Sequence, residues 1–367
     1  MVRVKRLELR DFRNYERAEV ALAPGLTVIC GPNGAGKTNL LEALYFGCTG
    51  RSCRTSNERE LVRFGQKVTR VSVGVEAEDG GHSLDVGFEP GEQKRFRIDG
   101  AQVDRPAPGE IRPLVGVFMP DRLDLVKGAP ALRRAHVDQV IAALWPARGT
   151  ARTEYSRALA QRNALVARIR AGTARRELLD PWDSELARHG IAVMEARRAA
   201  LSELEGPFAR LAAELGLPGR CALEYRPRSK AHDADGLRAE LVDRREDDLA
   251  RGFTGHGPHR DDVALTRDRR ALRSYGSQGQ QRVGLLALLF AEREVLAAAG
   301  RAPLMLLDDV MSELDASRRE RLVDLVRGGG QAVVSATEAE HVPGARESDD
   351  VELLFVADGA VALEAAA

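Results

Sequence analysis

The spacing of apolar residues near the N-terminus is typical of β-structure. Apolar side chains alternate with polar ones over residues 2–9, and Leu26–Cys30 is an unbroken apolar run that ends at Gly31 and Pro32. Alternation returns over residues 68–98, where turn sequences at 79–81 and 90–91 break it. These patterns predict a first strand, a buried strand that meets a tight turn, and a small layer of antiparallel hairpins.

Helical spacing replaces this pattern over residues 131–217, which are rich in Ala, Leu, Arg and Glu. Interruptions are expected at Pro146, at Pro181 and at Pro207. Residues 150–170 are long enough for a helix of about 30 Å, and a second helix after Pro181 predicts a short antiparallel hairpin. No heptad repeat is sustained, so an extended coiled coil is not expected.

The final third returns to an alternation of helices and strands. We expect a helix over 280–299, a strand over 303–307, a helix over 317–326 and a strand over 332–335. The fold class is therefore α/β, with an antiparallel β layer and an inserted helical subdomain. The predicted head consists of residues 1–120 and 250–367, and the helical lobe of residues 121–249.

Composition narrows the class of protein without identifying a partner. The chain has 367 residues, 44% apolar and 30% charged, with 55 basic and 55 acidic side chains. This balance is typical of a globular protein of two or three domains. No apolar run approaches the roughly 18 residues that cross a bilayer, and the four cysteines form no C-x-x-C pair. We expect a soluble cytoplasmic protein with no membrane partner.

A phosphate-binding loop is indicated by residues 31–38, which match G-x-x-x-x-G-K-[ST] between an apolar strand and a helical run. The glycines let the backbone wrap closely around phosphate oxygens. Lys37 is expected to reach the β and γ phosphates of ATP, and Thr38 to ligate Mg²⁺. The predicted nucleotide-binding residues here are Gly31, Pro32, Asn33, Gly34, Ala35, Gly36, Lys37 and Thr38.

Two carboxylates follow the apolar run 304–307, as in a Walker B strand. Asp308 is expected to bind Mg²⁺, and Asp309 to orient or deprotonate the attacking water, so Lys37, Asp308 and Asp309 are the predicted catalytic residues. A strand that ends in a solvated acidic turn is the alternative. It would rarely accompany a phosphate-binding loop by accident.

A third motif, at 274–282, directly precedes a long helix and is similar to the ABC signature. Ser277 is expected to cap that helix, whose free N–H groups and dipole form a second anion site. Taken alone, the motif is an ordinary helix start. Residues 312–315 resemble a D-loop, and this order of four motifs is hard to obtain by chance.

Together these motifs resemble the head of an ABC-type ATPase, and nearly the whole chain resembles the RecF family within the group that includes SMC and Rad50 heads. The resemblance rests on residues 9–15, 31–45, 51–55, 120–128, 257–262 and 277–282. It implies further nucleotide contacts by Arg13, Asn14 and Asn39. It also implies an ATP-dependent homodimer, in which Ser277, Gly279 and Gln280 of one chain meet the nucleotide held by Lys37 of the other.

The resemblance further implies a role in recombinational repair at gapped DNA, with RecR and RecO as partners and RecA loaded on single strands. Some residues depart from the general ABC pattern. Asp309 replaces the usual Glu, no Gln follows residues 115–118, where Asp121 lies nearby, and Thr337 or Glu338 lies near the place of the switch histidine. We therefore expect a weak, DNA-stimulated ATPase, in which slow hydrolysis of bound ATP sets how long the protein stays clamped. A transporter subunit and an SMC-like structural ATPase are the rival interpretations.

A local excess of basic residues over 51–70 is the candidate DNA contact, and the residues assigned to it are Arg51, Arg54, Arg63, Lys67 and Arg70. Contact with the duplex backbone is expected, because aromatic residues make up only 5% of the chain. A solvated helix face is the alternative. His256 and His259, followed by Asp261 and Asp262, resemble a metal cluster, but we expect a turn packed near the nucleotide head instead.

Overall fold

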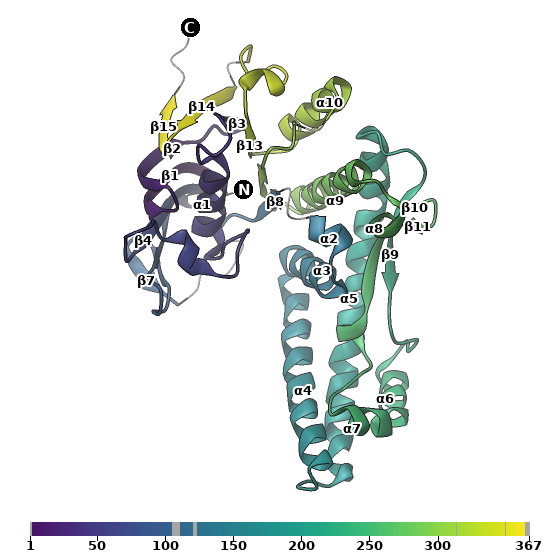
Figure 1. Ribbon diagram of the computed structural model, residues 1–367. Helices are drawn as coiled ribbons and strands as arrows, with labels where there is room; N and C mark the ends of the chain where they lie inside the picture. The colour runs from purple at the N-terminus through teal and green to yellow at the C-terminus, as the bar shows by residue number, and fades with distance from the viewer. Residues whose placement is uncertain (1, 105–110, 120–122, 313, 349, 364–367) are drawn as a thin grey trace. The chain divides into compact units, whose positions relative to one another are not determined.

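The computed structural model describes residues 2–104, 111–119, 123–312, 314–348 and 350–363. It divides into two compact units (Figure 1). The first unit comprises Met1–Arg122, Glu214–Gly216 and Leu289–Ala367, and the second comprises Leu123–Ala213 and Leu217–Leu288. No helix in the described ranges is both long and apolar enough to cross a membrane.

The first unit contains an antiparallel sheet with the strand order β2-β1-β4-β5-β6-β7. Its strands are β1 (Arg3–Phe12), β2 (Tyr15–Ala21), β4 (Thr69–Ala77), β5 (Gly80–Phe88), β6 (Arg95–Ile98) and β7 (Ala101–Val103). The two hairpins that the apolar alternation predicts over 68–98 are present as β4–β5 and β5–β6. Buried apolar residues alternate with outward-facing polar ones along β4, as a sheet with one solvated face requires.

A second sheet of the same unit is parallel except at one edge, in the order β15-β14-β3-β13-β12-β8. Its strands are β3 (Leu26–Cys30), β8 (Val115–Phe118), β12 (Leu304–Leu307), β13 (Ala332–Ala336), β14 (Val351–Ala357) and β15 (Ala360–Leu363). Every residue of β3, β12 and β13 is buried, which explains the uninterrupted apolar runs. The unit also contains η1 (Glu58–Leu61), α10 (Ala316–Arg327) and η5 (Ala339–His341).

Helix α1 (Lys37–Thr49) joins the two sheets into one core (Figure 1). Leu40 and Leu44 share a buried cluster with Val73 of the antiparallel sheet and Val333 of the parallel sheet. The helix approaches β4 so closely that a Cβ at Gly47 would lie 2.4 Å from a methyl carbon of Val73. The start of α1 is thereby fixed relative to the ends of β3, β12 and β13.

The second unit is built on two long antiparallel helices, α4 (Pro146–Arg170) and α5 (Leu179–Glu214) (Figure 1). Its other helices are α2 (Asp124–Lys127), α3 (Pro130–Leu144), η3 (Arg176–Leu178), α6 (Ala234–Asp243), α7 (Arg245–Arg251), η4 (Pro258–Arg260) and α8 (Leu272–Tyr275). The strands β9 (Cys221–Arg226), β10 (Asp262–Arg267) and β11 (Arg270–Ala271) form an antiparallel sheet. Helix α9 (Gln278–Ala298) begins in this unit and continues into the first.

The helical hairpin is confirmed, but the interruption expected at Pro207 is wrong, because α5 continues through it to Glu214. Proline removes one backbone hydrogen bond from a helix. The flanking Leu204, Phe208 and Leu211 are buried, and this packing offsets the lost bond. The unit division also differs from the expected domains. It groups residues 250–288 with the helical unit, since β10 pairs with β9 along its whole length.

Candidate functional site

The loop between β3 and α1 is shaped by its glycines. Gly31, Gly34 and Gly36 have φ values of 150°, 85° and 121°, a region that L-residues rarely adopt. A Cβ at Gly31 would lie 2.2 Å from the carbonyl oxygen of Val356, and one at Gly36 would lie 2.7 Å from Nδ2 of Asn14. Side chains are therefore excluded at both positions, and the loop backbone can approach a ligand closely.

Lys37 opens α1 with its ammonium group turned back into the loop. Its Nζ donates to the carbonyl oxygens of Gly31 at 2.7 Å and Pro32 at 3.0 Å. Burial lowers the pKa of Lys37, and the carboxylates of Asp309 and Asp308 oppose that change. The ammonium is thus held where phosphate oxygens would replace two neutral carbonyls, which are weaker acceptors.

Thr38 and Asp308 come together although 270 positions separate them in sequence. The Thr38 hydroxyl lies 2.8 Å from Oδ2 and 3.1 Å from Oδ1 of Asp308. Burial raises the pKa of Asp308, the nearby charge of Asp309 adds to this, and hydrogen bonds from Ser335 and Thr38 counteract it. A hydroxyl and a carboxylate are oxygen ligands of the kind that Mg²⁺ prefers, so these two residues fit the metal expected here.

Ser335 of β13 holds both carboxylate positions, and sequence reasoning gave it no role. Its hydroxyl donates to Oδ1 of Asp308 at 2.6 Å and accepts from the backbone N–H of Asp309 at 2.9 Å. Asp309 has φ 44°, so the chain turns sharply directly after Asp308. Ser335 thereby fixes the direction in which these two acids leave the strand.

Asn14 and Asn39, two of the residues that the resemblance assigned to the nucleotide, meet beside the loop. Asn39 Nδ2 donates to Oδ1 of Asn14 at 2.8 Å, and Asn14 Nδ2 donates to the carbonyl of Ala35 at 3.1 Å. The Tyr15 hydroxyl donates to the carbonyl of Gly36 at 3.0 Å. The segment after β1 therefore braces the loop from one side.

Arg13, the third of those residues, is engaged elsewhere. It forms a bidentate ion pair with the fully buried Glu42, with Nε 2.9 Å and Nη2 3.0 Å from the carboxylate. Glu42 also accepts from Ser52 at 2.5 Å and from Arg54 at 3.4 Å. Sequence reasoning noted Glu42 within a matching stretch without assigning it this function, because its partners are distant in sequence.

The signature-like turn lies in the second unit, at the start of α9. Ser277 and Gln280 cap each other: the backbone N–H of Ser277 donates to Oε1 of Gln280 at 3.0 Å, and the N–H of Gln280 donates to Oγ of Ser277 at 3.3 Å. Ser277 and Gly279 are exposed. Below them the buried Gln281 donates from Nε2 to the carbonyls of Leu272 and Gly276, both at 3.0 Å. The turn is thus anchored from within while its tip faces solvent.

The remaining motif positions are only partly described. Ser312 donates to the carbonyl of Asp309 at 3.0 Å, and Asp315 caps α10 through the N–H of Arg318 at 2.9 Å. Thr337 accepts the N–H of Gly31 on its carbonyl at 3.3 Å, which places it beside the phosphate-binding loop. Its hydroxyl also lies 2.9 Å from Nδ1 of His341. Asp121 lies outside the described residues.

The residues predicted to contact DNA do not form a helix face. Among the described residues of this stretch, η1 is a single short 3₁₀ turn, and Thr69 and Arg70 begin β4. Arg54 contacts Glu42, Arg63 pairs with Asp11 at 2.8 Å, and Arg70 lies on the outer side of β4. Arg51 and Lys67 are exposed. Phe64, which lies in the same stretch, is fully exposed, and sequence reasoning gave it no role.

The two histidines near 258 are hydrogen-bonded to side chains of the second unit. His259 hydrogen-bonds through Nδ1 to the Tyr155 hydroxyl at 2.7 Å, and His256 contacts Glu240 at 2.6 Å. Asp261 is fully buried and accepts the N–H of Arg228 at 2.7 Å. Within the described residues no group of three or more His, Cys, Asp or Glu is placed to hold a metal. The turn belongs to the second unit, not to the unit that contains the loop.

Comparisons with known proteins agree with this arrangement. The model of the RecF/RecN/SMC N terminal domain family matches residues 3–355. The chain is 40% identical over 362 residues to the DNA replication and repair protein RecF of Acidothermus cellulolyticus, with 94% of this chain and 96% of the relative covered. It is 38% identical to the protein of the same name from Streptomyces avermitilis, with 93% and 95% covered.

Solved structures extend the comparison to the fold. A structure of the recombination mediator protein RecF with ATP, from the RecFOR pathway, superimposes with a TM-score of 0.86 at 27% identity and covers 99% of this chain and 98% of that one. An Smc head domain from Pyrococcus furiosus superimposes with a TM-score of 0.61 at 18% identity, with 98% and 95% covered. The second likeness concerns the fold alone.

Proposed function

This chain belongs to the RecF family, and on that premise we propose that it is an ATP-dependent DNA-binding recombination mediator of the cytoplasm. The observation that carries the proposal is the hydrogen bond between the Thr38 hydroxyl and the Asp308 carboxylate at 2.8 Å. It joins the end of the phosphate-binding loop to the acidic end of β12, the arrangement that a nucleotide with a divalent cation requires.

We place the triphosphate of ATP in the loop of residues 31–38. Phosphate oxygens take over the Lys37 ammonium from the carbonyls of Gly31 and Pro32, and the first N–H groups of α1 face the same charge. Asn14 and Asn39 support the rim of the loop. Arg13 acts through Glu42, because its guanidinium is already bound there.

Thr38 and Asp308 would hold Mg²⁺, which when bound neutralises charge on the phosphates. Asp309 orients the attacking water or accepts a proton from it. Its side chain is one carbon shorter than the Glu of transporter ATPases, and Thr337 occupies the region where a switch histidine is expected. Slow hydrolysis stimulated by DNA follows from this proposal, so that bound ATP sets the lifetime of a clamped state.

A second chain completes the nucleotide site in this proposal. Ser277 and Gly279 are exposed at the N-terminus of a long helix, which supports a role in meeting the phosphates of a partner protomer together with Gln280. ATP then adds contacts that only the dimer makes and shifts the equilibrium toward it. The solved RecF structures belong to the RecFOR pathway, which supports RecR and RecO as partners. RecA loading at gaps is the outcome that we propose.

The family comparison favours this proposal over a transporter subunit or an SMC-like structural ATPase. The test combines Lys37→Met with measurements of ATP binding and of duplex binding by the purified full chain. We expect the variant to lose ATP affinity and, with it, the stimulation of duplex binding by ATP. The proposal would be overturned if ATP did not change duplex binding by the wild-type chain and the variant bound duplex equally well.

A further inference from the structure

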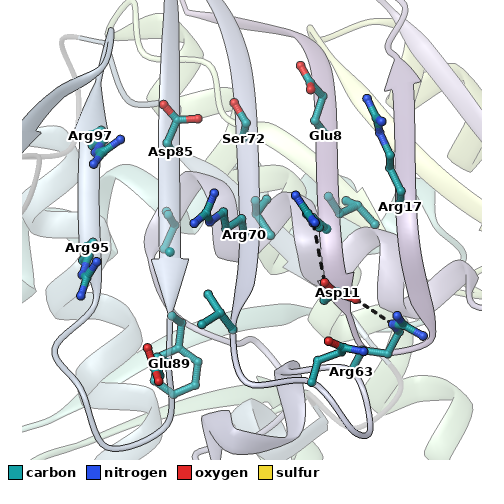
Figure 2. Close-up of a pocket in the computed structure, with 18 of the residues that line it drawn as sticks. Glu8, Asp11, Arg17, Arg63, Arg70, Ser72, Asp85, Glu89, Arg95 and Arg97 are labelled. Atoms are coloured by element: carbon teal, nitrogen blue, oxygen red, sulfur yellow. Dashed lines mark hydrogen bonds and ion pairs between the residues drawn. The ribbon is translucent and has the colours of Figure 1, made fainter.

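The outer face of the antiparallel sheet carries a row of arginines that crosses five strands. Arg10 of β1 lies opposite Arg17 of β2 on one side and opposite Arg70 of β4 on the other. Arg70 lies opposite Gly87 of β5, which in turn lies opposite Arg95 of β6. All four arginines are exposed. We call this set the arginine row; Figure 2 shows three of its members, Arg95, Arg70 and Arg17.

The row has little counter-charge. Arg10 approaches Asp11 only at 3.8 Å and its side chain is 73% exposed. Among the described residues, the side chains of Arg17, Arg70 and Arg95 make no ion pair or hydrogen bond. Like charges on directly opposed residues of an antiparallel pair are destabilising. Repulsion within the row therefore lowers the stability of the folded chain, and a bound polyanion would offset that repulsion.

The next row of the same face is different, because its charges are largely balanced. Glu8 lies opposite Glu19, and Arg6 contacts both carboxylates, at 2.6 Å and 3.1 Å. Further along that row Asp85 lies opposite Arg97 (Figure 2). These acids are thus occupied or faced by other cations and leave the arginine row unneutralised.

The row lies in a long polar hollow of about 1110 Å³, larger than the roughly 300–1,000 Å³ of small-molecule sites. Other acids in the hollow lie off the row: Arg63 holds Asp11 and lies 3.6 Å from Glu16, and Glu89 and Glu92 belong to the turn after β5. Strands are about 4.8 Å apart, so the row spans about 19 Å. That length corresponds to about five base-pair steps along the axis of duplex DNA, at 3.4 Å per step.

We propose that the arginine row contacts the sugar–phosphate backbone of duplex DNA, with one DNA strand laid across β2, β1, β4, β5 and β6. Guanidinium forks match phosphate oxygens, and the row contains no apolar or aromatic anchor of the kind that protein interfaces use. This inference rests on the proposed DNA binding and moves its centre from residues 51–70 to the sheet. Of the residues assigned from sequence, only Arg70 belongs to the row.

The test measures affinity for a fluorescent blunt duplex over a range of salt concentrations, with ATP and Mg²⁺ present. The double variant Arg17→Gln/Arg70→Gln is compared with wild type and with Arg188→Gln, an exposed arginine of α5 that pairs with Glu185. Each lost phosphate contact lowers the slope of log K against log salt by about 0.9, so the double variant should lose about 1.8 units of slope and on the order of 50-fold in affinity at 0.1 M salt.

ATP affinity of the double variant should match that of wild type, and its thermal midpoint should be equal or higher, since neither arginine has a partner to lose and the repulsion from Arg10 is removed. Unchanged slope and affinity in the double variant, while wild type binds duplex, would overturn the assignment of the row and leave the proposed function intact. Polyglutamate serves as a model of an acidic protein partner. If the double variant kept its duplex affinity but lost polyglutamate binding, the row would be a protein-binding surface, and its assignment to DNA would be overturned. A wild-type chain that binds no duplex with ATP would overturn the proposed function itself.

Discussion

Removal of the Ser335 hydroxyl should weaken the magnesium-dependent part of ATP binding. In Ser335→Ala the buried Asp308 loses a donor at 2.6 Å and the N–H of Asp309 loses its acceptor at 2.9 Å. Hydrogen bonds to charged groups contribute about 1.5–3 kcal/mol. Removal of a group that orients a metal ligand typically lowers metal affinity about 10- to 100-fold. The free energy of unfolding should fall by a similar 1.5–3 kcal/mol, at order of magnitude.

The variant should also change the pH dependence of stability without magnesium. Burial already raises the pKa of Asp308 above its unfolded value, so this group stabilises the folded chain below the unfolded pKa and loses that contribution as pH rises through the folded pKa. Without Ser335 the folded pKa rises further, and the loss should extend to higher pH. Urea unfolding across a pH series, with and without Mg²⁺, measures this shift.

The assay compares ATP affinity in Mg²⁺ with ATP affinity in chelator, by titration of a fluorescent ATP analogue. Ser335→Ala should bind ATP about 10- to 100-fold more weakly than wild type in Mg²⁺. In chelator its ATP affinity should stay near that of wild type, because Lys37 and its loop are unchanged. Ser83→Ala on β5 is the matched control, since its hydroxyl makes only a 3.5 Å contact with Asp85. An equal loss in both conditions, or no loss with Mg²⁺, would refute the reasoning.

Three further predictions concern single residues. Arg162→Met leaves two buried aspartates without their shared cation, so chemical denaturation should show a loss of about 3–5 kcal/mol. Burial lowers the pKa of His259 to about 4, so stability should fall as pH drops from about 6.5 toward 4, by up to about 3 kcal/mol; His259→Gln should flatten that part of the curve, and an unchanged curve would contradict this. Asp309→Asn should slow single-turnover hydrolysis about 10²- to 10⁴-fold and prolong the ATP-bound dimer. If the variant hydrolysed ATP at the wild-type rate, Asp309 would be excluded as the base.

Local spacing in the sequence was enough to predict the elements that carry the nucleotide chemistry. The glycines of the loop, the apolar run before Asp308 and the helix after Ser277 each follow from a short pattern whose physical cause lies within a few residues. The same holds for the hairpins and for Pro146 and Pro181 at helix starts.

What could not be predicted depends on residues that are distant in sequence. Ser335 reaches Asp308 only because β13 pairs with β12. Glu42 contacts Arg13 and Arg54 only because β1 and α1 pack in one core. The arginine row exists only in the register of five strands, which no single stretch of sequence specifies. Pro207 could not be placed inside a helix without knowledge of the packing around it.

The central claim is that ATP brings two copies of the chain together through the exposed turn at Ser277. Sedimentation velocity of the wild-type chain and of Ser277→Arg, each with and without ATP and Mg²⁺, tests it directly. We predict that ATP converts the wild-type chain to a dimer while the variant binds ATP and remains a monomer. A variant that dimerises with ATP as fully as wild type, or a wild-type chain that ATP leaves monomeric, would contradict the account.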